Sequence, residues 1–308
     1  MLASVGLCIC YLIGSGNVAE APSAERKAAG ANRIRVRPSM RTPLTKGGEL
    51  PRRDVSSAVA VICGSSRTDA DRYDVRNDAL RSIARLRELG PAGVGSLMEY
   101  VASEEVLLHP AREAALRNDV LNLLRSQERM PDGLPELLMG IALRGRHDAT
   151  IVDYAIQHLG ALQHELETEE ESVLVRDLFA VVGAMTDRPY AGTALYALAD
   201  SRKLSAAESE RLRRLTVSAC SPGANPLVRL SAIQLAGQRG YREVLPEIKA
   251  ILAGDRRDAV LDTVAVGALG LLGDMSDIDL LTKFSARGGS RLAFPVETAV
   301  KRIRERTE

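Results

Sequence analysis

The chain has 308 residues, of which 45% are hydrophobic and 26% charged, a composition typical of a soluble folded protein. Only 3% of the residues are aromatic and Trp is absent, whereas compact enzyme cores and surfaces that stack nucleic-acid bases usually contain more large rings. Closely packed helices lined by small and aliphatic side chains need few rings, so the composition favours a helical protein. The net charge of +1 indicates no particular class of partner.

Residues 1–21 resemble an export signal. Leu2 to Ile13 form a mostly apolar run that is too short to span a membrane, which takes about 20 helical residues. The run is followed by Val18-Ala19-Glu20-Ala21, the small–x–small pattern of a cleavage site. The segment departs from a typical signal because no Lys or Arg precedes the run and Pro22 follows the cleavage pattern. We expect a mature chain that is exported (periplasmic or extracellular) and has no transmembrane segment; without cleavage the chain would be cytoplasmic.

Residues 22–53 form a basic arm with nine Lys or Arg residues against two Glu, a net charge of +7. The remaining residues 54–308 hold 32 basic and 37 acidic residues, a net charge of −5. Pro, Ala, Arg and Gly are frequent in the arm and no apolar period is present, which predicts a disordered linker. A basic arm can also bind nucleic acid, acidic polymers or lipid headgroups. No aromatic residue lies in the arm, so base stacking is not supported.

A repeated pattern occupies residues 54–308. Each copy has an apolar residue, often followed by Arg, then two variable positions, Ala and another apolar residue, as in Val75-Arg76-Asn77-Asp78-Ala79-Leu80. The central alanines are Ala79, Ala115, Ala155, Ala194, Ala232, Ala265 and Ala299. They are 36, 40, 39, 38, 33 and 34 residues apart, and such intervals are typical of stacked helical repeats.

Each copy has the periodicity of an amphipathic helix. In one copy the apolar positions at helical spacing are Leu261, Val264, Ala265, Ala268, Leu269 and Leu272. The small alanine is expected to let a neighbouring helix approach closely. The glycine-containing segments at Gly237 and at Gly270 with Gly273 are expected to end this helix in a left-handed conformation. A second helix then opens with Leu-Pro at Pro135 and at Pro246, where proline loses no helical hydrogen bond.

The segments Val228–Ile248 and Leu261–Leu281 resemble HEAT repeats of the short bacterial kind that is also found in phycobilisome-lyase-type proteins. The likeness rests on the apolar-Arg start, the central Ala, the run Ala268-Leu269-Gly270-Leu271-Leu272-Gly273-Asp274 and the Leu-Pro opening. Repeats 2, 3 and 4 show fragments of this pattern. The resemblance covers about residues 70–305 and implies an all-α fold, an α-solenoid of six to seven helical hairpins. It implies no reaction.

The four histidines, His109, His147, His158 and His164, do not form a metal motif. His158 and His164 are six residues apart and so lie on different faces of a helix, and no H-x-x-x-H or H-E-x-x-H spacing occurs. HEAT-repeat deoxyhypusine hydroxylases hold iron with several His-Glu pairs, whereas His164-Glu165 is the only such pair here. We therefore predict no metal, no cofactor and no catalytic residue.

Two groups of acidic residues have simple structural explanations. Asp274, Asp277 and Asp279 lack the register of a calcium loop, and helix N-capping by Ser276 or Asp277 explains them. A second group contains Glu165, Glu167, Glu169, Glu170 and Glu171. It is expected to be a solvated loop; the alternative is a contact for a basic partner, such as the arm of this chain.

Cys63 and Cys220 both lie in apolar runs near opposite parts of the array. They are expected to be buried small side chains without a disulfide, which requires Cα atoms within about 7 Å.

The sequence favours a non-catalytic protein-protein interaction scaffold that holds a protein or peptide partner in the concave groove of the solenoid. Arg76, Arg112 and Arg229 are expected to make contacts between repeats and not to bind the partner. One alternative is an accessory, lyase-like enzyme that acts on a protein-bound cofactor, which the repeat resemblance permits. The other is binding of nucleic acid or acidic polymers through the arm. HEAT-like DNA alkylation glycosylases have a basic, aromatic concave face, which contrasts with the net charge of −5 here.

Overall fold

The computed structural model describes residues 52–64, 73–105, 108–144, 147–163, 168–184, 187–201, 204–255, 258–288 and 292–307. The chain divides into two units, Met1–Val55 and Ser56–Glu308. The predicted export signal and all of the basic arm except its last two residues lie outside the described residues. Arg52 and Arg53, which the sequence placed at the end of the arm, instead form the first turn of helix α2.

Every regular element in the described ranges is helical. The α-helices are α2 (Arg52–Ile62), α3 (Tyr73–Ile83), α4 (Gly90–Ala102), α5 (Pro110–Arg125), α6 (Leu134–Arg144), α7 (Ala149–Leu162), α8 (Thr168–Ala184), α9 (Ala191–Asp200), α10 (Ala206–Ala219), α11 (Pro226–Arg239), α12 (Leu245–Ala253), α13 (Ala259–Leu272), α14 (Ile278–Gly288) and α15 (Ala293–Thr307). Two short 3₁₀ helices, η1 (Arg242–Val244) and η2 (Met275–Asp277), precede α12 and α14. No helix among the described residues is long and apolar enough to cross a membrane.

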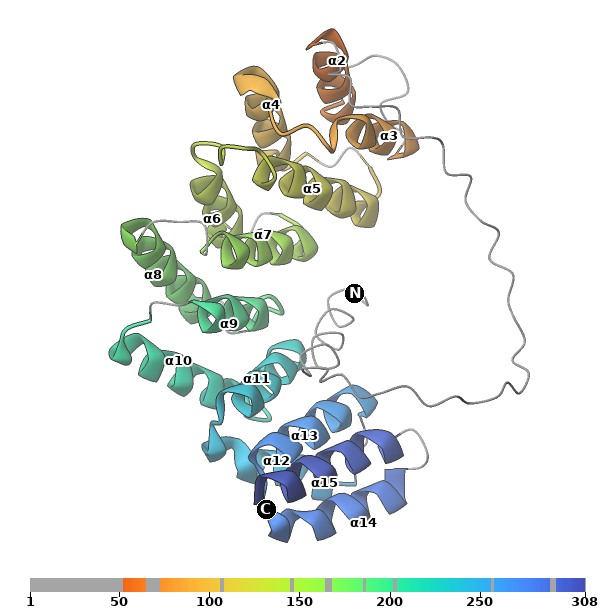
Figure 1. The fold of residues 1–308 in the computed structure, drawn as a ribbon, viewed down its shortest axis with the longest axis vertical. Helices are drawn as coiled ribbons and strands as arrows, with labels where there is room; N and C mark the ends of the chain where they lie inside the picture. The colour runs from red at the N-terminus through yellow and green to blue at the C-terminus, as the bar shows by residue number, and fades with distance from the viewer. Residues whose placement is uncertain are drawn as a thin grey trace, which may run out of the picture. The chain divides into compact units, whose positions relative to one another are not determined.

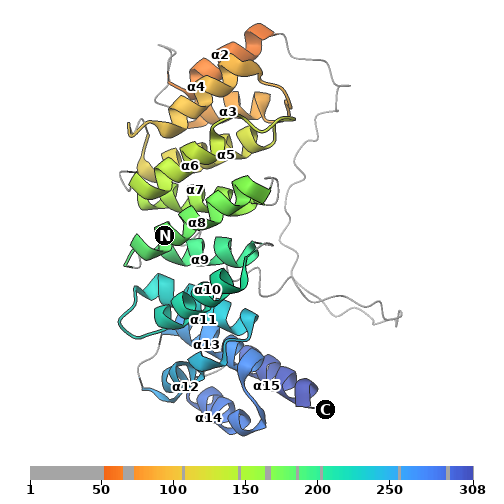
Figure 2. The ribbon, with the colours of Figure 1, turned by 90° about the vertical axis from the view of Figure 1, so that its left-hand side faces the viewer.

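The helices from α3 to α15 stack in two layers (Figures 1 and 2). The odd-numbered helices form one layer, in which each helix packs against the next odd-numbered helix from α3 to α15. The even-numbered helices form the other layer, and each packs most extensively against the odd-numbered helix that follows it, as α6 does against α7 and α12 against α13. The predicted all-α solenoid of six to seven helical hairpins is confirmed. We call the layer of α3, α5, α7, α9, α11, α13 and α15 the odd layer.

Three helices of the odd layer begin with the same device. Asp148, Asn225 and Asp258 precede α7, α11 and α13, and each side chain accepts a hydrogen bond from a backbone N–H of the first turn at 2.8 to 3.1 Å. This satisfies a donor that has no partner within the helix. Each capping residue lies seven positions before a central alanine. The cap is therefore part of the repeat, although the sequence analysis did not include it.

The central alanines do not all have the same environment. Ala155, Ala194, Ala232, Ala265 and Ala299 are at most 2% exposed. Ala79 and Ala115 are only half-buried, so the first two copies bury their central alanine less completely than the later ones. In those copies larger side chains occupy the buried face of the helix, among them Arg76 and Leu80 in α3 and Leu116 and Arg117 in α5.

The glycines of the repeat have two roles. Gly240 ends α11 in the left-handed conformation, with φ of 75°, as expected. Gly273 ends α13 in an extended conformation, so the left-handed expectation is wrong there; a Cβ at this position would lie 2.7 Å from the carbonyl oxygen of Leu269. Gly237 and Gly270 lie inside α11 and α13 and not at their ends.

Gly237 and Gly270 allow neighbouring helices of the odd layer to touch. A Cβ on Gly237 would lie 3.1 Å from Cα of Ala268, and a Cβ on Gly270 would lie 2.8 Å from Cα of Ala299. Gly160 of α7 meets Ala197 of α9 in the same way, with 3.3 Å to its Cα. The helix axes can approach because neither side presents a side chain larger than a methyl group.

Arginines from neighbouring helices close several helix C-termini. Arg229 donates to the carbonyl of Cys220 at 2.9 Å after α10, and Arg287 donates to Leu252 at 3.0 Å near the end of α12. Arg306, in the charged last helix α15, donates to the carbonyls of Leu271 at 2.6 Å and Gly273. The last carbonyls of a helix have no partner within it, so these contacts join neighbouring repeats as well as completing each helix.

Candidate functional site

The histidines are placed apart. His109 is exposed before α5, His147 is half-buried before α7, and His158 is buried inside α7. His164 lies outside the described residues. Within the described ranges, no group of three or more His, Cys, Asp or Glu side chains is placed to hold a metal ion.

Both cysteines of the array are free thiols. Cys220 is buried and donates to the carbonyl of Thr216 at 3.3 Å, and Cys63 is half-buried and contacts the carbonyl of Ser96. Burial raises the pKa of Cys63 to about 11 and that of Cys220 to about 12. Both thiols are therefore protonated at neutral pH, which makes them poor nucleophiles.

The acidic turn before α14 caps a helix, but through a different residue from the ones expected. Asp274 accepts from the backbone N–H of Ser276 at 2.9 Å, and the side chain of Asp277 accepts from the backbone N–H of Asp274 at 3.1 Å. This reciprocal pair is a capping box on η2. Lys249 of α12 neutralises Asp277 at 2.6 Å. The expectation of an N-cap at Ser276 or Asp277 is therefore wrong. Asp274 is the N-cap, and Asp277 completes its capping box.

The acidic run is also placed differently from the expectation. Glu169, Glu170 and Glu171 belong to the first turns of α8 and not to a loop. Glu165 lies outside the described residues, as does Glu167. Carboxylates are favourable at this position because the first turn of a helix is the positive end of its dipole.

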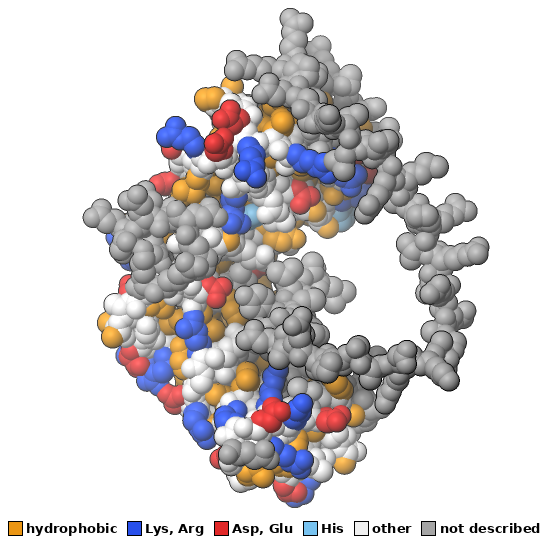
Figure 3. All heavy atoms as spheres, in the orientation of Figure 1, with side chains coloured by type: hydrophobic (Ala, Val, Ile, Leu, Met, Phe, Trp, Pro, Cys, Tyr) orange, Lys and Arg blue, Asp and Glu red, His pale blue; other side chains and the backbone are white. Residues whose placement is uncertain are grey.

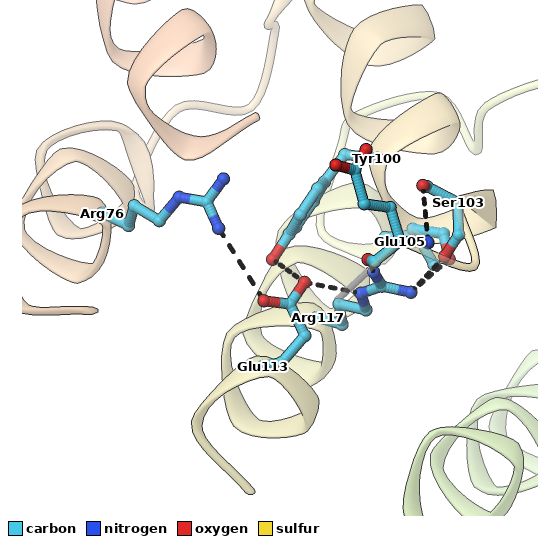
Figure 4. A network of polar contacts seen from close by, with 7 residues as sticks. Arg76, Tyr100, Ser103, Glu105, Glu113 and Arg117 are labelled. Carbon is cyan, nitrogen blue, oxygen red and sulfur yellow. Dashed lines mark hydrogen bonds and ion pairs between the residues drawn. The ribbon is translucent and has the colours of Figure 1, made fainter. Parts of the chain in front are cut away.

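A buried polar network joins α3, α4 and α5 (Figure 4). Glu113 of α5 accepts from Tyr100 Oη at 2.9 Å and from Arg117 Nε at 2.9 Å. Arg76 of α3 points at the same carboxylate, with Nη1 3.8 Å from Glu113 Oε2. Arg117 also donates to the carbonyls of Ser103 and Glu105 after α4. The network is closed from solvent, because Arg76 and Glu113 are 0% exposed and Arg117 is 1% exposed.

The charge of this network is unbalanced, because two guanidinium groups share one carboxylate. The ring of Tyr100 lies under both guanidinium groups, with 5.5 Å from Arg76 and 5.3 Å from Arg117 to the ring centre. Burial and the Glu113 carboxylate raise the pKa of Tyr100. None of the three Arg76 nitrogens donates a hydrogen bond within the described part of the chain. The sequence missed this network, although Glu113 and Arg117 have the i, i+4 spacing of a helical ion pair.

The other two arginines of the repeat pattern also make contacts between helices. Arg112 lies over the ring of Tyr73, 5.6 Å from its centre. Arg229 lies 3.8 Å from Glu247 of α12 in addition to its contact after α10. With Arg76, these residues are used to hold helices together.

A second polar group links α5 to α7. His158 is 4% exposed, and its Nε2 lies 3.1 Å from Oδ1 of Asn118 while its Nδ1 lies 3.4 Å from Arg125. Burial, followed by the positive charge of Arg125, lowers the pKa of His158 to about 4. The imidazole is therefore neutral at neutral pH and serves as a hydrogen-bonding spacer between the helices.

A third polar group links α7 to α9. Asp153 accepts from Gln157 at 2.8 Å within α7, and the hydroxyl of Thr193 in α9 donates to its other oxygen. Asp153 is 7% exposed. Its carboxylate holds Gln157 in a defined position at the surface of the odd layer.

These contacts hold Asn118, Gln157 and Thr193, three partly exposed side chains of the odd layer. We use the name polar face for these three side chains together with Asn122 and Tyr154 of the same helices α5 and α7. Asn122 is exposed and the others are half-buried. Amides and hydroxyls can both donate and accept, so the polar face can bind polar groups without supplying a net charge.

Two open pockets lie between helices. The first, about 530 Å³, lies between α6 and α8, and we call it the α6–α8 pocket. The second, about 560 Å³, is formed by residues of α8 to α11 and is lined mostly by small and apolar side chains. In the view of Figure 3 the acidic and basic side chains of the described residues are interspersed over the surface.

No protein-family model matches the chain, and no curated protein is detectably similar to it in sequence.

Proposed function

We propose that the array is a non-catalytic scaffold that binds another protein across the polar face of the odd layer. The observation on which this proposal depends is that the polar face is already ordered by contacts between helices. His158 holds Asn118, and Asp153 holds Gln157 and Thr193. Side chains that are fixed before binding lose less conformational entropy when a partner arrives.

The chemistry of the polar face suits a protein surface. Tyrosine is enriched in protein interfaces because it offers a large contact area with a hydroxyl at its end, and Tyr154 supplies one. The amides of Asn118, Asn122 and Gln157 match the donors and acceptors of a polypeptide backbone. The buried charged side chains of this region, as in the network of Glu113, instead hold helices together.

The HEAT-repeat resemblance supports the same proposal. The array has the alternation of helices in two layers that such repeats imply, and residues at a fixed interval cap helices and allow close approach. A solenoid exposes a long surface for its length because each repeat contacts only its neighbours. We therefore propose that the chain is a bacterial HEAT-repeat protein whose partner is recognised by the positions that vary between repeats.

We propose further that the protein is exported, on the strength of the apolar run Leu2–Ile13 and the Val18–Ala21 cleavage pattern. N-terminal sequencing of the protein purified from its native host tests this directly. A mature N-terminus at Pro22 supports export, and an intact Met1 in the cytoplasmic fraction contradicts it.

Binding at the polar face is tested with the full chain and two charge-introducing variants. Asn122→Arg places a bulky cation on the polar face, and the matched control Ser209→Arg places the same group on exposed α10 of the even layer. Proteins captured from native extract by the wild type and by Ser209→Arg should be lost from Asn122→Arg. Recovery of the same proteins by all three would remove the polar face as the binding surface.

A further inference from the structure

The α6–α8 pocket combines an apolar floor with an acidic rim. Its lining includes Met130 and Pro131 before α6, Met139 in α6, and Val173 and Leu174 in α8. Val173 is 47% exposed, one of the most exposed large apolar side chains of the described residues. A pocket of about 530 Å³ lies within the range that binds small ligands and single side chains of a partner.

The charged side chains that line this pocket are all carboxylates. They are Asp132, Glu136 and Asp177. Asp177 is paired with Arg176, which lies 3.2 Å away. Asp132 and Glu136 are both exposed, and neither has an ion-pair partner among the residues that the structure describes. The pocket therefore presents two uncompensated negative charges beside apolar surface.

We propose that the α6–α8 pocket binds an arginine-rich linear segment of a partner protein in which basic and aliphatic residues alternate. Arginine fits because its planar guanidinium can bind a carboxylate through two parallel hydrogen bonds while its methylene stem lies along apolar surface. The neighbouring aliphatic residue occupies the apolar floor at Met139 and Val173. This inference rests on the proposed scaffold function, but it concerns a surface on the even layer that is separate from the polar face.

The test measures binding of a short fluorescein-labelled peptide of alternating Arg and Leu to the full chain by fluorescence anisotropy. The double variant Asp132→Asn with Glu136→Gln should bind about tenfold more weakly, because it removes the acceptors of the charged hydrogen bonds. Val173→Ser should weaken binding a few-fold through loss of apolar contact. Affinity for the wild type should also fall as ionic strength rises.

Two controls separate the pocket from a general effect of charge. The double variant Glu88→Gln with Asp255→Asn removes two exposed carboxylates elsewhere in the array, so it changes the net charge equally and should bind like the wild type. A peptide of alternating Arg and Ser should bind more weakly than the Arg–Leu peptide. Circular dichroism of each variant confirms that the helices are retained.

Several outcomes overturn the proposal. Equal affinities of the pocket variant and the Glu88/Asp255 variant would show that binding reflects net charge alone. Tighter binding after Arg33, Arg35 and Arg37 are replaced by Ala would identify the basic arm of this chain as the occupant. A concentration-dependent dimer that Asp132→Asn with Glu136→Gln abolishes would identify a second copy. Because the capture experiment at Asn122 does not involve the pocket, failure here leaves the scaffold function intact.

Discussion

The two ends of the array join their helices by different means. From α3 to α9 the contacts between neighbouring odd-layer helices include buried polar groups: Arg76 with Glu113, His158 with Asn118, and Asp153 with Thr193. From α11 to α15 small residues meet, as at Gly237 with Ala268 and Gly270 with Ala299, and one such contact, Gly160 with Ala197, also lies between α7 and α9. The interval between repeats nevertheless remains similar along the chain.

This difference shows that neighbouring helices of one repeat array can be joined by two chemically distinct kinds of contact. Small residues bring helices close and gain from dispersion contacts that are not specific to one partner. Polar networks join helices through directional contacts, and a buried donor or acceptor that stays unsatisfied is costly. The region that uses polar networks is also the region that presents the polar face, so the groups that join its helices also order its surface.

The largest expected effect is at the centre of the polar region. Glu113→Gln leaves Arg76 and Arg117 buried without a compensating charge, and we expect the free energy of unfolding to fall by about 3 to 5 kcal/mol. Chemical denaturation followed by circular dichroism measures this loss. An effect below that of a surface substitution would show that the network does not hold α3, α4 and α5 together.

The next effect is a pH dependence that arises in the polar region. The folded-state pKa of His158 is about 4, below the ordinary value of 6.5, so the unfolded chain binds a proton that the folded chain excludes. The contribution of neutral His158 to the free energy of unfolding is complete above pH 6.5 and is lost as the pH falls towards 4. Between about pH 7 and about pH 5 this loss is about 2 kcal/mol. His158→Gln should remove this slope. An unchanged slope would place the titration elsewhere.

The small-residue region is tested by two glycines of the same helix, α13. Gly270→Ala puts a Cβ 2.8 Å from Cα of Ala299, which forces α13 and α15 apart and should cost about 1 to 2 kcal/mol. Gly267 is half-buried and a Cβ there would have no neighbour within 4 Å. Gly267→Ala should therefore raise the free energy of unfolding by about 0.5 to 1 kcal/mol through helix propensity. Thermal unfolding of both variants measures these changes. If both variants change the free energy of unfolding in the same direction, Gly270 has no close-contact role.

The smallest effect returns to the polar region. Arg76→Met removes a buried guanidinium that makes no hydrogen bond within the described ranges and leaves Glu113 paired with Arg117 and Tyr100. We expect a change of less than about 1 kcal/mol, because the lost attraction is offset by relief of desolvation. Comparison with Glu113→Gln by the same denaturation measurement sharpens the contrast, and a loss as large as that of Glu113→Gln would show that Arg76 is an equal partner in the network.

The repeat period, the helices and the Leu-Pro openings at Pro135 and Pro246 could be predicted because they are local. Apolar spacing and proline geometry act within a few residues, and seven copies reinforce one another. The half-burial of Ala79 and Ala115 could not be predicted, since burial depends on which side of the helix meets its neighbour. The N-cap was expected at Ser276 or Asp277 and lies at Asp274, because several nearby side chains can accept the same backbone hydrogen bonds at a helix end.

The polar groups that order the candidate surface were invisible in the sequence for a different reason. Asn118 and His158 are forty residues apart, as are Asp153 and Thr193, and no local pattern marks such pairs. By itself the amino-acid sequence determined the all-α repeat, its interval and the small residues that fit it, because these depend on local geometry. Only the tertiary structure decided which charges are buried, which amides are held at the surface and which carboxylates of the α6–α8 pocket lack an ion-pair partner among the described residues, because each of these depends on the neighbouring repeat.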